Sequence, residues 1–150
     1  MIKVEQEYFL NVPQQQVFEY LSQPVNDSEW QSSCKEVRTG LGTPGVGFCY
    51  TICFRFLSRE MIFDMEVFDY QPYRSFGYRT VSGPMAFRGF YRFEAVDNAT
   101  RLHWTFEAEP GGFFGIVPQS VLKKVLTKQV QADLSCLEKL LSATHAVEVA

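Results

Sequence analysis

The sequence predicts an α+β fold in which a seven-stranded antiparallel sheet wraps around a long C-terminal helix and two short helices follow the first strand. First, alternate residues between Ile2 and Glu109 are apolar or aromatic, which is the period of strands with one buried face. Second, only short turns separate these runs, and such turns favour antiparallel pairing. Third, after Pro118 the apolar residues recur at helical spacing.

The first 31 residues are predicted to hold one strand and both short helices. The strand covers residues 2–11. Pro13 then begins a helix, because a proline at the first helical position gives up no hydrogen bond, and Pro24 ends it. The second helix is predicted at residues 26–31, with Asn26 or Asp27 as its N-cap.

Six further strands and the long helix account for the rest of the chain. The strands are predicted at residues 34–41, 48–57, 59–70, 73–81, 85–96 and 101–109. The helix is predicted from Pro118 to Ser142, and at 1.5 Å per residue it is about 37 Å long, enough to cross a sheet. Residues 1–150 are predicted to form a single domain, ordered over about residues 2–142, with a frayed tail at residues 143–150.

Composition excludes several classes of function. A formal charge of −3 and the lack of a basic stripe disfavour nucleic acid as a partner. Lys3 and Glu5 interrupt any signal peptide, and no apolar segment is long enough to span a bilayer. The four cysteines form no C-x-x-C pair and the two histidines are remote, so neither a metal site nor a cofactor is predicted. We expect a reduced, cytoplasmic protein.

One face of the predicted sheet is almost free of charge, which predicts an aromatic-lined cavity between the sheet and the C-terminal helix. The residues predicted to bind a ligand there are Tyr8, Tyr50, Phe54, Phe63, Met65, Tyr78, Phe87, Tyr91, Trp104, Phe106, Leu126, Gln129, Val130 and Asp133. The tyrosine hydroxyls either orient an oxygen of an otherwise apolar ligand or bond to one another, to the backbone or to trapped water.

Asp133 is the one candidate for a catalytic residue. It lies at the centre of the apolar stripe of the predicted helix, with Gln129 beside it. A carboxylate in apolar surroundings costs free energy unless it is paired or its pKa rises. Asp133 is therefore either a cavity acid that bonds the ligand or transfers protons, or a structural carboxylate held by a partner.

An apolar loop precedes the long helix. Phe113 and Phe114 are predicted either to gate an entrance to the cavity or to fasten the helix to the sheet.

Several motifs carry a resemblance to a known superfamily. They are Leu10-Asn11-Val12-Pro13 followed by Val17-Phe18, then Trp30, Gly45-Val46-Gly47, Tyr70-Gln71-Pro72-Tyr73-Arg74, Thr100-Arg101-Leu102-His103-Trp104-Thr105, and Asp133-Leu134 with Leu137. Together they resemble the START-like (SRPBCC) superfamily, which includes polyketide cyclases and the birch pollen allergen. The resemblance implies a helix-grip fold. It also favours the structural role for Asp133, because an acidic residue is common there in the family.

Three functions remain open at this stage. The uncharged lining favours binding or transport of a hydrophobic small molecule such as a lipid, polyketide, quinone or isoprenoid, without catalysis. The first alternative is an enzyme of the cyclase, aromatase or dehydratase type that uses the same cavity to orient a reactive chain. The second is an interaction protein with a filled core. We expect a monomer or homodimer that makes at most transient contact with membranes.

Overall fold

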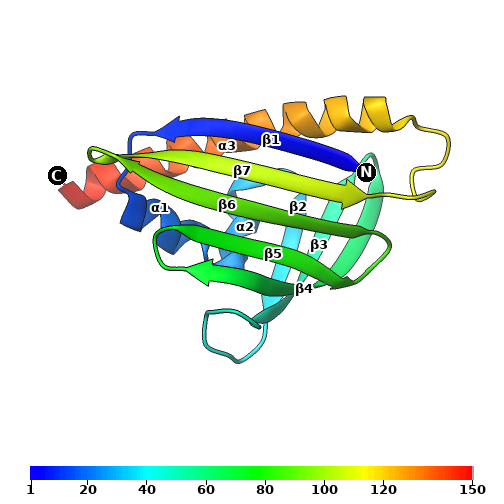
Figure 1. The fold of residues 1–150 in the computed structure, drawn as a ribbon, viewed down its shortest axis with the longest axis horizontal. Coiled ribbons are helices and arrows are strands. Elements are labelled where there is room, and N and C mark those ends of the chain that lie inside the picture. The colour runs from blue at the N-terminus through cyan, green and yellow to red at the C-terminus, as the bar shows by residue number, and fades with distance from the viewer. Residues whose placement is uncertain (150) are drawn as a thin grey trace.

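The computed structural model describes residues 1–149, and its central feature is one curved antiparallel sheet (Figure 1). The strands are β1 (Ile2–Leu10), β2 (Cys34–Thr39), β3 (Cys49–Phe56), β4 (Arg59–Gln71), β5 (Ser75–Ser82), β6 (Ala86–Val96) and β7 (Ala99–Glu109). Their order across the sheet is β1-β7-β6-β5-β4-β3-β2, so β1 pairs with the last strand while the other strands form a meander.

The helices lie on one side of the sheet. They are α1 (Gln14–Leu21), the 3-10 helix η1 (Pro24–Asn26), α2 (Asp27–Trp30) and α3 (Gln119–Val149). In Figure 1, α3 runs behind β1 and β7 along the long axis of the molecule. This is the helix-grip fold that the sequence predicts, with seven strands and two short α-helices after the first strand.

The predicted strand parity is confirmed by burial. In β4, the alternate residues Met61, Phe63, Met65 and Val67 are each 5% exposed or less. Their neighbours on the other parity are exposed or half-buried, as the charged residues there require. The buried face of the sheet and the buried stripe of α3 form the core.

Most element boundaries differ from the prediction by one or two residues, and two of these differences have a clear reason in backbone geometry. The fifth strand begins at Ser75 rather than Tyr73, because Tyr73 has a φ of 67° and lies in a turn closed by the Arg74 N–H and the Gln71 carbonyl (2.9 Å). The second strand ends at Thr39 instead of Leu41, because the glycine-rich loop that follows is exposed.

The C-terminal helix is longer than predicted. It continues through residues 143–149, which the sequence analysis assigns to a frayed tail, and Ala150 lies outside the described residues. No Gly or Pro interrupts this segment, and Ala143 and Ala146 are strong helix formers. His145 also contacts α1, with its Nδ1 3.1 Å from the Gln16 Oε1. Within residues 1–149, no helix has a stretch long and apolar enough to cross a bilayer.

The connection from β1 to α1, and α1 itself, are held against the sheet. Thr100 in β7 is fully buried, and its hydroxyl donates to the Val12 carbonyl at 2.7 Å. Phe18 in α1 then packs its ring against those of Tyr70 and Phe93, each with centroids 5.4 Å away. These contacts close one end of the sheet and leave a cavity toward the start of α3.

Candidate ligand cavity

A cavity of about 100 Å³ lies between the sheet and α3. It is lined by twelve of the residues predicted to bind a ligand: Tyr50, Phe54, Phe63, Met65, Tyr78, Phe87, Trp104, Phe106, Leu126, Gln129, Val130 and Asp133. Further lining comes from residues that the prediction did not name, among them Asp27, Gln31, Ser33, Ile52, Met61, Ala108 and Leu122. Strand parity and helical periodicity thus predict most of the residues that line the cavity.

Two predicted residues lie elsewhere. Tyr8 is near the edge of the sheet, and its hydroxyl bonds the Glu138 carboxylate on α3, so it does not line the cavity. Tyr91 is only 1% exposed and packs beneath Trp30 and Trp104, with ring centroids 6.5 Å and 5.4 Å away. Strand parity assigns both residues correctly to the inner face of the sheet. It does not predict that Tyr8 lies near the edge of that face or that other side chains cover Tyr91.

The middle of the cavity is narrowed by phenylalanines. The Phe87 ring lies 4.8 Å from that of Phe63, 5.9 Å from that of Phe54 and 5.5 Å from that of Phe106. Pockets that hold drug-sized ligands usually enclose about 300–1,000 Å³. The cavity is therefore large enough for a compact molecule, and a larger one requires these rings to move.

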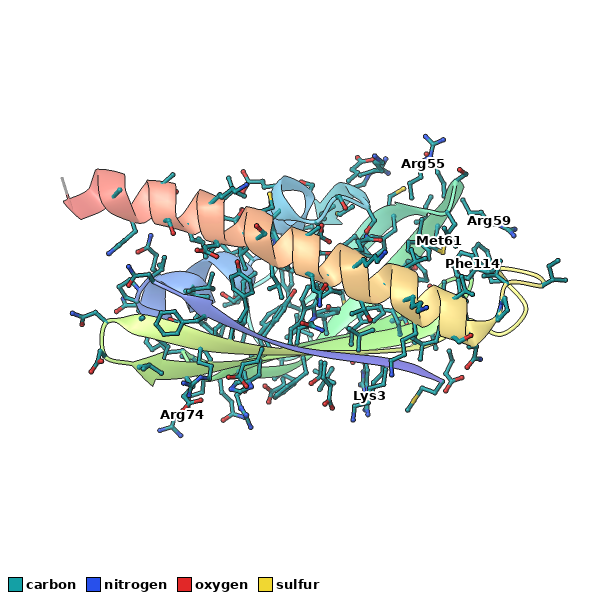
Figure 2. All side chains as sticks on the ribbon, turned by 90° about the horizontal axis from the view of Figure 1, so that it is seen from above. Lys3, Arg55, Arg59, Met61, Arg74 and Phe114 are labelled. Atoms are coloured by element: carbon teal, nitrogen blue, oxygen red, sulfur yellow. The ribbon has the colours of Figure 1, made fainter. Side chains whose placement is uncertain are left out.

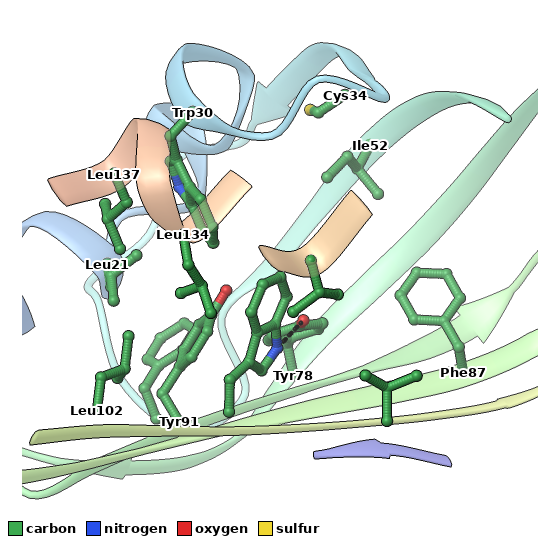
Figure 3. Close-up of a cluster of buried hydrophobic side chains, with 14 of the residues drawn as sticks. Leu21, Trp30, Cys34, Ile52, Tyr78, Phe87, Tyr91, Leu102, Leu134 and Leu137 are labelled. Atoms are coloured by element: carbon green, nitrogen blue, oxygen red, sulfur yellow. Dashed lines mark hydrogen bonds between the residues drawn. The ribbon is translucent and has the colours of Figure 1, made fainter. Parts of the chain in front are cut away.

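A hydrogen bond between two aromatic residues fixes the floor of the cavity. The Trp104 indole N–H donates to the Tyr78 hydroxyl at 3.2 Å (Figure 3). Tyr78 lies directly over Gly89, where an added Cβ would come within 2.0 Å of the tyrosine ring. Burial raises the pKa values of Tyr50 and Tyr78 above their ordinary range, so both hydroxyls stay protonated at neutral pH.

Asp27 is the residue that the sequence analysis missed. It was assigned only as a possible N-cap, yet it is 9% exposed and lines the cavity. Burial raises the pKa of its carboxyl well above the ordinary value, while the nearby indole N–H of Trp30 acts in the opposite direction. A signal was present, because Asp27 and Trp30 are three residues apart and share one helical face.

Asp133 differs from Asp27 in being held by the backbone. It is 4% exposed, and its Oδ1 accepts a hydrogen bond from the Ser32 N–H at 3.1 Å. Burial raises the pKa of its carboxyl, and the Ser32 bond partly offsets this. Asp133 therefore connects α3 to the turn after α2 while also facing the cavity.

The polar end of the cavity thus contains acids and amides. Asp27, Asp133, Gln31, Gln129 and Ser33 line it. Among the described residues, no Lys, Arg or His lines the cavity. This end can supply oxygen acceptors, and it can supply carboxylic acid protons while the two acids are neutral.

The opposite end is bordered by the loop before α3. Phe114 lines the cavity and packs against Phe56 with a centroid distance of 5.5 Å, whereas Phe113 lies outside the cavity. Arg59 holds Phe113, because its guanidinium lies 4.3 Å above the ring and its Nη1 donates to the Phe113 carbonyl at 2.6 Å. Figure 2 shows Arg59, Met61 and Phe114 together at this end of the molecule.

The fold agrees with the comparisons with known proteins. The sequence profile of the family described as polyketide cyclase/dehydrase and lipid transport matches residues 1–142, so the chain belongs to that family. A comparison with curated proteins gave no match.

Solved structures share the fold at low sequence identity. A protein from Thermus thermophilus superposes with a TM-score of 0.81 at 14% identity, over 95% of this chain and 98% of that one. A START superfamily protein from Mycobacterium smegmatis gives 0.80 at 11% identity, with coverages of 95% and 98%. The Zhui aromatase/cyclase from a Streptomyces species gives 0.72 at 17% identity, with coverages of 99% and 95%.

Proposed function

We propose that this protein binds a compact hydrophobic molecule in the cavity between the sheet and α3. The observation that carries the proposal is the cavity itself, which has apolar and aromatic walls and polar groups gathered at one end. Such a combination is typical of small-molecule sites, where the apolar walls supply affinity and a few polar groups fix orientation. The family description, which includes lipid transport, supports the same function.

The cavity volume limits the ligand. At about 100 Å³, the space is too small for a complete lipid, quinone or isoprenoid chain in this arrangement of side chains. The ligand is therefore a small aromatic or aliphatic molecule, or a longer one that displaces the phenylalanines around Phe87.

A search for a molecule that copurifies with the protein tests the proposal directly. Native mass spectrometry of the purified protein, followed by organic extraction, identifies any bound molecule, and titration with that molecule measures its affinity. Ala108→Leu places a larger side chain in the cavity, and we expect it to weaken binding at least about tenfold. Ala95→Leu is the matched control, because Ala95 is exposed. Equal binding by both variants contradicts a site in this cavity.

A second candidate is catalysis of the cyclase or dehydratase type. Two buried acids with raised pKa values face the same cavity, and carboxylic acids of this kind can act in proton transfer near neutral pH. Incubation of the extracted passenger with wild-type protein, Asp27→Asn and Asp133→Asn tests this function. Turnover by the wild type that either variant abolishes supports it, and an unchanged passenger argues against it.

A further inference from the structure

The polar end of the cavity identifies a ligand class more closely than the apolar walls do. Resting on the proposed function, we propose that the ligand is a compact hydrophobic amine whose ammonium group pairs with Asp27. Three independent features of the cavity lead to this inference: its balance of charged groups, the free carboxyl of Asp27 and the aromatic rings around it.

The cavity contains acids without bases. Asp27 and Asp133 both line it, and the described lining residues include no Lys, Arg or His. A buried carboxylate is costly unless a positive charge or several hydrogen bonds compensate it. A ligand that brings its own cation supplies the missing partner, whereas an anionic ligand such as a fatty acid finds no cation in the lining to compensate its charge.

Asp27 is the acid that is available to a ligand. Asp133 already accepts a hydrogen bond from the Ser32 N–H. The Trp30 indole N–H lies close enough to lower the pKa of the Asp27 carboxyl, but this N–H makes no well-formed hydrogen bond within residues 1–149. A carboxyl that is only 9% exposed, faces a cavity and has no firm partner is an acceptor with room for an N–H donor.

Aromatic rings surround the same end of the cavity. Tyr50, Tyr78 and Trp104 all line it, and the two tyrosines lie close enough to Asp27 to feel its charge. Aromatic faces attract organic cations, and the effect grows when the cation is desolvated. The rings also pack against the hydrocarbon part of an amine, and the volume of about 100 Å³ restricts that part to about the size of one ring.

Binding of an amine changes the protonation of the protein. In the empty cavity, burial favours the protonated form of the Asp27 carboxyl, because it raises the pKa of that group well above its ordinary value. The ammonium ion enters with its own proton, the carboxyl loses its proton to solvent, and the carboxylate–ammonium pair forms. The other titratable groups that face Asp27 are Tyr20, Cys34, Tyr50, Tyr78 and Tyr91, whose raised pKa values keep them neutral. Asp133 shares the cavity, so its own variant must be measured as well.

Three probes of nearly the same shape test the proposal with the full chain. Benzylamine, benzyl alcohol and benzoate are titrated by calorimetry in two buffers of different ionisation enthalpy, so that proton release is measured along with affinity. We expect the amine to bind about tenfold tighter than the alcohol or better, benzoate to bind weakest, and amine binding to release protons, up to about one per amine. Asp27→Asn removes both the preference for the amine and the proton release, while affinity for the alcohol changes less than about twofold.

Two variants serve as controls. Asp97→Asn makes the same chemical change in an exposed turn where φ is 55°, a conformation that Asn accepts, and it leaves all three affinities unchanged. Asp133→Asn lowers amine affinity less than Asp27→Asn does, because Asp133 is already bonded to Ser32. Thermal unfolding of each variant shows that it is folded at the temperature of the titration.

The outcomes separate this inference from the proposed function. Three results would each overturn the proposal that the ligand is an amine. They are equal affinities for the amine and the alcohol, a preference for benzoate, and undiminished amine binding by Asp27→Asn. If none of the three probes binds but a neutral molecule extracted from the protein does, the proposal of an amine ligand is overturned and the proposed function stands. If neither probes nor extract yield a ligand, both are overturned.

Discussion

At the scale of single residues, Gly89 determines how Tyr78 is placed in the cavity floor. An alanine at this position would bring its Cβ to 2.0 Å from the Tyr78 ring, so the ring and its bond to Trp104 must shift. We expect Gly89→Ala to lower the free energy of unfolding by about 2–3 kcal/mol through overpacking and the strained hydrogen bond. Urea unfolding measures this effect. Gly112→Ala is the control, since nothing lies within 4 Å of its added Cβ, and a similar loss in both variants contradicts the argument.

Asp27 makes stability depend on pH. Its folded-state pKa is raised by burial, so the folded protein holds this proton more tightly than the unfolded chain. The stabilisation is complete below the unfolded pKa of about 3.9 and is lost as the pH rises toward the folded pKa, at up to about 1.4 kcal/mol per pH unit. We therefore expect Asp27→Asn to flatten the fall in stability above pH 4, and Asp97→Asn to leave it unchanged. Urea unfolding at about pH 4–8 tests this, and an identical slope in Asp27→Asn contradicts it.

At the scale of elements, the β3–β4 hairpin and the loop before α3 act together through Arg59. Arg59 lies at the start of β4 and holds Phe113, while the adjacent Phe114 closes the cavity against Phe56. The sequence predicts either that this loop gates the cavity or that it fastens the helix. Arg59 holds the loop through two interactions, the contact with the Phe113 ring and the hydrogen bond to the Phe113 carbonyl, and both must break before the loop can move.

A kinetic experiment distinguishes gating from fastening. If the loop is a gate, Arg59→Ala weakens its closed state, and we expect both association and dissociation of a ligand to become about threefold to tenfold faster with little change in affinity. Stopped-flow titration with a bound passenger measures both rates. Arg55→Ala is the control, because Arg55 is exposed on the adjacent strand. A loss of stability without any change in rates shows that the loop only fastens α3.

At the scale of the whole molecule, the sequence predicts the fold better than it predicts the site. Period-two burial in strands such as β4 and the apolar stripe of α3 are long-range patterns that any covered sheet requires, so element order and most cavity walls follow from them. Asp27 is not predicted because α2 has only four residues, so the face that Asp27 shares with Trp30 is a single pair and not a repeating helical period. Tyr8 and Tyr91 are misplaced because depth beneath the inner face depends on the curvature of the sheet and on neighbours such as Trp30.

The whole molecule also balances stability against binding, since the same aromatic rings fill the core and narrow the cavity. Phe87 contacts three other phenylalanine rings and is 8% exposed, so Phe87→Ala should cost about 3–5 kcal/mol of stability. The same change enlarges the cavity, and we expect naphthalene to bind this variant but not the wild type. A ligand at about a hundred times its Kd restores about 2.7 kcal/mol, which appears as a rise in Tm.

Phe90→Ala is the matched control for Phe87→Ala. Phe90 lies on the same strand but on the opposite face, where its ring stacks on that of Phe68 with centroids 6.4 Å apart. Its loss removes aromatic surface without enlarging the cavity, so naphthalene should not raise the Tm of this variant. A ligand-dependent rise in Phe90→Ala would show that the effect does not come from enlarging the cavity at Phe87. The absence of a rise in Phe87→Ala would argue that the cavity does not expand at the phenylalanine cluster. The apolar part of any ligand would then be restricted to the space beside Asp27 and Tyr50.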